Sequence, residues 1–79
     1  MPNDPRARLG LGMLTAIVTD DREGFLAITD EFEGGCPEAL ATFGRVVQAS
    51  IRMVASDSGV TPEQVVQNVA LRIEAAGFA

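Results

Sequence analysis

The residues of this sequence best suited to chemistry are carboxylates, and most of them lie between positions 20 and 38. That segment holds seven of the eleven acidic residues and a single basic one, Arg22, so its net charge is −6. Helix capping and a solvated helix face explain most charge runs of this kind. The alternative is a docking surface for a basic protein partner. Its candidates are Asp30, Glu31 and Glu33, because carboxylates near the C-terminal end of a helix oppose the helix dipole.

The remaining side chains offer little to catalysis. The chain has no His, Lys, Tyr or Trp, and its one cysteine, Cys36, has no general base or basic side chain to activate it. Cys36 precedes the longest predicted helix, where a thiol can be reactive, but a buried, small apolar role is the preferred interpretation. The acids also lack the spacing of a calcium-binding loop. The sequence therefore predicts a protein that is not an enzyme and has no metal or cofactor.

One stretch, Ala55 to Ala70, resembles the corner of a helix-turn-helix DNA-binding motif. Four residues have the core spacing of that motif: Ala55, Gly59, Val60 and Val65. The match is partial, because Ser58 and Asn68 stand where the motif usually has apolar residues. A DNA-reading helix with Arg72 as its single basic residue, on a chain of net charge −5, is also poorly suited to phosphate contacts. A well-capped helix corner explains the same residues.

Length and composition limit the possible folds. At 79 residues and 47% hydrophobic content, the chain is expected to form one domain with an aliphatic core, preceded by a flexible arm over residues 1–4. A core of this size stabilises a fold by only about 3 to 5 kcal/mol, so self-association is the remaining source of stability. The negative charge disfavours nucleic acid and anionic membranes. The ten-residue apolar run 9–18 is too short to span a bilayer, and the single cysteine fits a cytoplasmic protein.

Apolar periodicity and capping signals predict a small all-α four-helix bundle, with helices near 5–18, 21–33, 37–58 and 62–76. The expected N-caps are Asp4 before Pro5, Asp20 in a box with Glu23, and Thr61 in a box with Gln64. Glycines should end the later helices: Gly34, Gly59 and Gly77. Gly10 and Gly12 inside the first helix suggest close approach of another helix, and fraying of the start of this helix is the alternative. The last helix should face the core with Val65, Val66, Val69, Ala70, Ile73 and Ala76.

The helix predicted over 37–58 has apolar residues around most of its circumference, so it has more apolar surface than one neighbour can cover. We therefore expect a homodimer with five residues of this helix in the shared core: Leu40, Phe43, Val47, Ile51 and Val54. Together with the acidic segment, this predicts a non-enzymatic protein-interaction module that binds itself and one further protein. The alternative is a DNA-binding regulator that uses the corner at Ala55 to Ala70.

Overall fold

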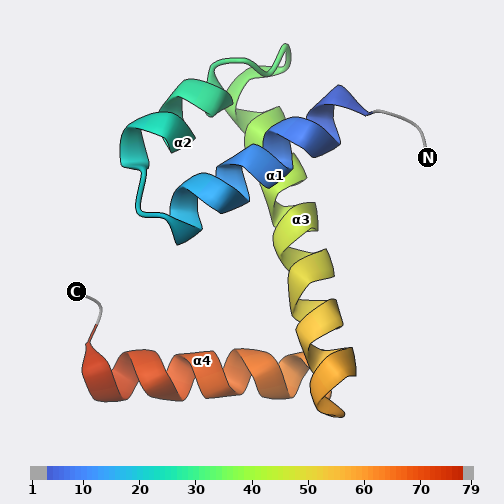
Figure 1. Cartoon of the computed structure of the whole chain (residues 1–79), viewed down its shortest axis with the longest axis vertical. Coiled ribbons are helices and arrows are strands. Elements are labelled where there is room, and N and C mark those ends of the chain that lie inside the picture. The colour runs from blue at the N-terminus through green and yellow to red at the C-terminus, as the bar shows by residue number, and fades with distance from the viewer. Residues whose placement is uncertain (1–3, 78–79) are drawn as a thin grey trace. The chain divides into compact units, whose positions relative to one another are not determined.

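A computed structural model describes residues 4–77, which form four helices and no strand (Figure 1). The helices are α1 (Pro5–Val18), α2 (Arg22–Thr29), α3 (Gly35–Ser58) and α4 (Pro62–Ala76). The predicted small all-α fold is confirmed. The chain divides into two compact units, Met1–Val47 and Gln48–Ala79, called here the N-terminal and C-terminal units. Each unit has its own packing, and α3 contributes residues to both.

The helix starts follow the capping signals, with one correction. Asp4 accepts a hydrogen bond from the Arg6 backbone N–H at 2.9 Å, and Thr61 and Gln64 form the reciprocal capping box of α4. The cap of α2, however, is Asp21, which accepts a hydrogen bond from the Gly24 backbone N–H. Asp20 has a φ of 58° and belongs to the left-handed turn after α1, so it does not have the extended backbone that an N-cap requires.

The connection between α2 and α3 differs from the prediction. α2 ends at Thr29, four residues before the predicted end, and α3 begins at Gly35, two residues before the predicted start. Gly35 has the left-handed backbone, with φ of 73°, that was expected at Gly34. The physical reason for the early end is Phe32. Phe32 lies in the connection and is buried in the core. Its side chain reaches this position because the backbone after Thr29 is no longer helical.

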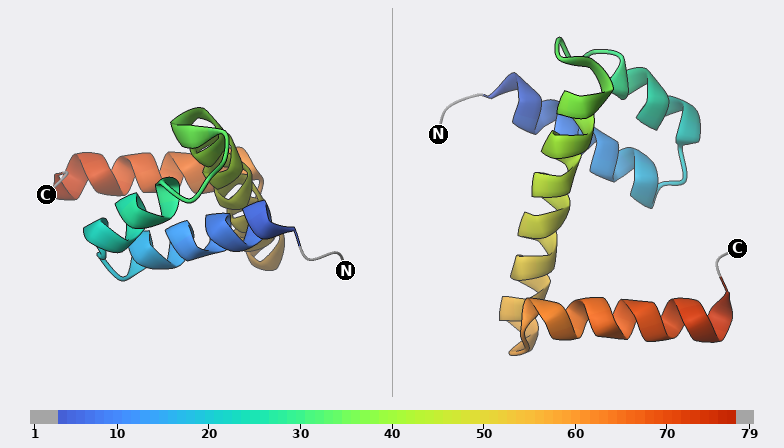
Figure 2. Two further views of the ribbon diagram at one scale, coloured as in Figure 1. Left: turned by 90° about the horizontal axis from the view of Figure 1, so that it is seen from above. Right: turned by 180° about the vertical axis from the view of Figure 1, so that it is seen from behind.

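The core of the N-terminal unit is small and lies where α1, α2 and the first half of α3 meet (Figure 2). Its fully buried centre consists of Met13, Phe32 and Ala39, and four partly buried residues pack around them: Leu9, Phe25, Ile28 and Phe43. The rings of Phe25 and Phe43 meet edge to face, with their centroids 5.4 Å apart. Residues of three helices and one connection thus share a single core.

The predicted close approach at the glycines of α1 is confirmed. A Cβ added to Gly10 would lie 2.8 Å from Val46 Cγ2 and 3.1 Å from Thr42 Cγ2, both on α3. A Cβ at Gly12 would lie 3.1 Å from Ile28 Cδ1 on α2. Gly10 is buried, so the backbone of α1 lies directly against side chains of α3.

The C-terminal unit has almost no core of its own. Ala55 is its one buried residue within 48–77, with 2% of its surface exposed. The helix corner is closed by Gly59, at φ of 71°, and by a hydrogen bond from the Val60 N–H to the Ala55 carbonyl at 3.0 Å. The predicted ends of α3 at Gly59 and of α4 at Gly77 are confirmed. The burial predicted for one face of α4 is wrong, because no residue of α4 is buried.

Two glycines inside helices give a matched test of the α1–α3 contact. Gly10→Ala is expected to lower the free energy of unfolding by about 1 to 2 kcal/mol, because Val46 is β-branched and cannot easily move away from the new methyl group. A methyl group added at Gly44 on α3 meets nothing within 4 Å. Gly44→Ala should therefore raise the free energy of unfolding by about 0.5 to 1 kcal/mol through helix propensity alone. Urea unfolding at one fixed protein concentration measures both changes. Equal effects of the two substitutions would contradict the close contact.

Candidate functional site

The surface of the N-terminal unit contains a hollow of about 310 Å³, called here the acidic hollow. It lies between the start of α1, the α2–α3 connection and the first turn of α3. Eight residues line it: Asp4, Pro5, Arg6, Leu9, Glu31, Phe32, Glu33 and Glu38. Four of these are acidic and one is basic, so the formal charge of the lining is −3. Of the apolar members, Phe32 belongs to the core and Leu9 packs against it.

Two of the four carboxylates that line the acidic hollow accept hydrogen bonds from backbone N–H groups. Glu38 Oε1 accepts a hydrogen bond from the Gly34 N–H at 3.3 Å, which ties the first turn of α3 to the connection before it. Asp4 Oδ1 accepts the Arg6 N–H and also lies 3.5 Å from the Arg6 Nε. Because both side chains of that ion pair are exposed, the pair contributes little to stability. The backbone hydrogen bond, aided by the Arg6 charge, lowers the pKa of Asp4 below its usual value.

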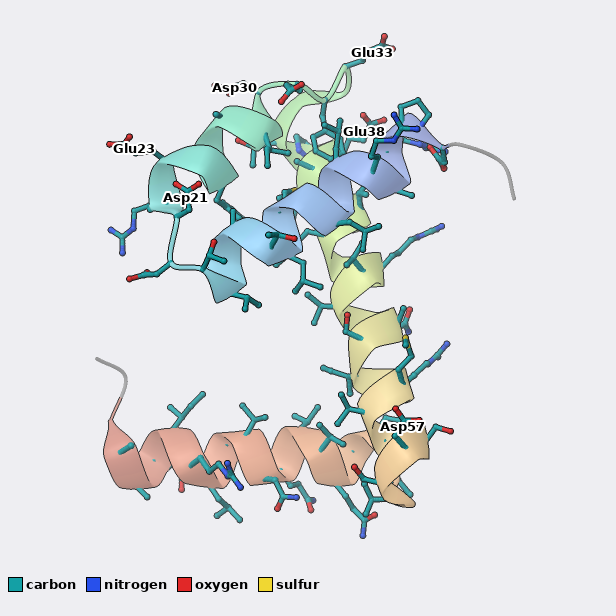
Figure 3. The ribbon with its side chains drawn as sticks, viewed as in Figure 1. Asp21, Glu23, Asp30, Glu33, Glu38 and Asp57 are labelled. Carbon is teal, nitrogen blue, oxygen red and sulfur yellow. The ribbon has the colours of Figure 1, made fainter. Side chains whose placement is uncertain are left out.

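The other two carboxylates that line the hollow, Glu31 and Glu33, accept no hydrogen bond from a described backbone group. Both are exposed, and neither side chain takes part in an ion pair or hydrogen bond within the described residues. Figure 3 shows Glu33 at the tip of the connection, extending away from the helices. Arg6 lines the same hollow but is paired with Asp4, so these two negative charges have no ion-pair partner among residues 4–77.

The three residues predicted to bind a partner lie close to this hollow. Glu31 and Glu33 line it, and Asp30 is the C-cap of α2 immediately before them. All three were expected on the second helix, but they follow it because α2 ends at Thr29. Glu38 belongs to the acidic segment 20–38 of the sequence, whereas Asp4 is recognisable there only as a helix cap. The proximity of these two acids depends on the packing of α1 and α3.

The five residues predicted for a dimer core have mixed surroundings along α3. Leu40 and Val54 are exposed, at 72% and 52%, and Val47 and Ile51 are half-buried. Phe43 packs against Phe25 and belongs to the edge of the core. Self-association through this face stays a prediction, and Phe43 has less free surface for it than the sequence pattern indicated.

The exposed apolar residues are concentrated in the C-terminal unit. Seven of the twelve exposed large hydrophobic side chains belong to it: Met53, Val54, Val60, Val66, Val69, Leu71 and Ile73. Val66, Val69 and Ile73 of α4 are among the residues predicted to face the core. They are exposed because the unit contains only the end of α3 and α4 itself.

Other candidate chemistry has no support within residues 4–77. Cys36 is exposed, which corrects the prediction of a buried thiol. It is the second residue of α3, in a turn that faces solvent. No group of three or more Cys, Asp or Glu side chains in the described part of the chain is placed to hold a metal ion. Among the described helices, none is long and apolar enough to cross a membrane.

Comparison with known proteins does not assign the chain to a family. No protein family matches its sequence, and no match is found among curated proteins or solved structures.

The lowered pKa of Asp4 predicts a pH dependence at the edge of the acidic hollow. Because the folded state favours the ionised carboxylate, the stabilisation by this cap is complete above the unfolded value of 3.8 and is lost as the pH falls through the lower folded value. Asp4→Asn retains a capping side chain but cannot titrate. An NMR titration of the Asp4 carboxyl carbon, with the Arg6 amide followed alongside, should show a midpoint below 3.8. A midpoint at or above that value would contradict the hydrogen bond.

Proposed function

We propose that the chain is a non-enzymatic protein-interaction module whose acidic hollow receives a basic segment of a protein partner. The observation that carries this proposal is the pair Glu31 and Glu33, two exposed carboxylates without an ion-pair partner among residues 4–77, in a hollow that is also lined by Pro5 and Leu9. Arg and Lys side chains combine an apolar stem with a cationic end. Such a side chain would place its apolar stem against the apolar lining and its positive charge beside Glu31 and Glu33.

The proposal also includes self-association of the module. The chain exposes twelve large apolar side chains within its described residues, and the buried centre of its main core holds three residues. Small domains with so little buried apolar surface are commonly stabilised by oligomerisation. A second copy is the partner that is always present at the same concentration. The acidic hollow and most of the exposed apolar side chains belong to different units of the chain.

A charge-neutralising variant tests the acidic hollow. Asp30→Asn combined with Glu31→Gln and Glu33→Gln is expected to weaken binding of a basic partner at least tenfold, because three carboxylates at one surface are lost. The matched control is Asp57→Asn with Glu63→Gln and Glu74→Gln, which makes the same change of net charge at exposed residues of the C-terminal unit. Partners captured from a lysate and a synthetic Arg- and Leu-containing peptide serve as the two probes.

Binding should also weaken as salt is raised, since exposed charge pairs are screened. If the two triple variants bind the peptide and the captured partners equally well, the acidic hollow is not the binding surface. Equal weakening by both variants would show an effect of total charge and would also reject the hollow as a specific site.

DNA binding through the α3–α4 corner is the second candidate function. Its support is the geometry of the corner, with Ala55 buried and Gly59 in the left-handed conformation, as the helix-turn-helix spacing predicts. The charges oppose it. α4 carries Arg72 against Glu63 and Glu74, and phosphate contacts supply most of the affinity of DNA-binding proteins.

We therefore expect no retention of the chain on heparin and no binding of mixed-sequence DNA at low salt. Electrophoretic mobility shift and heparin chromatography measure this directly. Binding of the wild type that is lost in Arg72→Ala, and kept in the matched substitution Arg22→Ala outside α4, would favour the DNA-binding alternative.

A further inference from the structure

We draw no further inference here: the strongest candidate, the exposed apolar face of α4 formed by Val66, Val69 and Ile73, carries none because nothing among the described residues shows what covers it.

Discussion

The contact between α1 and α3 at Gly10 is the constraint on which the arrangement of the N-terminal unit depends. With no side chain at this position, the backbone of α1 lies directly on Thr42 and Val46 of α3. The same approach brings the start of α1 to the start of α3, which places Asp4 and Glu38 around one hollow. A wider separation of the two helices would open the core around Met13 and disperse the carboxylates.

Much of the local structure could be predicted from the sequence, because it is decided by neighbouring residues. Asp4 before Pro5, the Thr61–Gln64 box, and the glycines at 59 and 77 each act within one helical turn, and the structure contains all of these features. The α2–α3 connection could not be predicted in this way. Its course depends on Phe32 entering a core made by three helices, and that gain outweighs four further residues of helical hydrogen bonding.

The candidate site was predictable in part for the same reason. The concentration of acids in 20–38 is visible in the composition, and Glu31 and Glu33 do line the hollow. Glu38 and Asp4 are 34 positions apart in the chain, so only tertiary packing brings them together. For α4, periodicity correctly marks one apolar side, but periodicity alone does not show whether that side is covered within the chain or by another molecule.

Charge and exposed apolar surface are separated along the chain, and this separation connects the two proposed interactions. The N-terminal unit has the strong negative charge together with the main core, whereas most exposed large apolar side chains lie in the nearly neutral C-terminal unit. A surface of one charge repels a copy of itself but attracts a basic partner, and an apolar surface without charge does neither. The proposed self-association would give an assembly that contains two acidic hollows, one on each copy. Two linked sites bind a divalent or repeated basic ligand more tightly than one site does, even when each individual contact is weak.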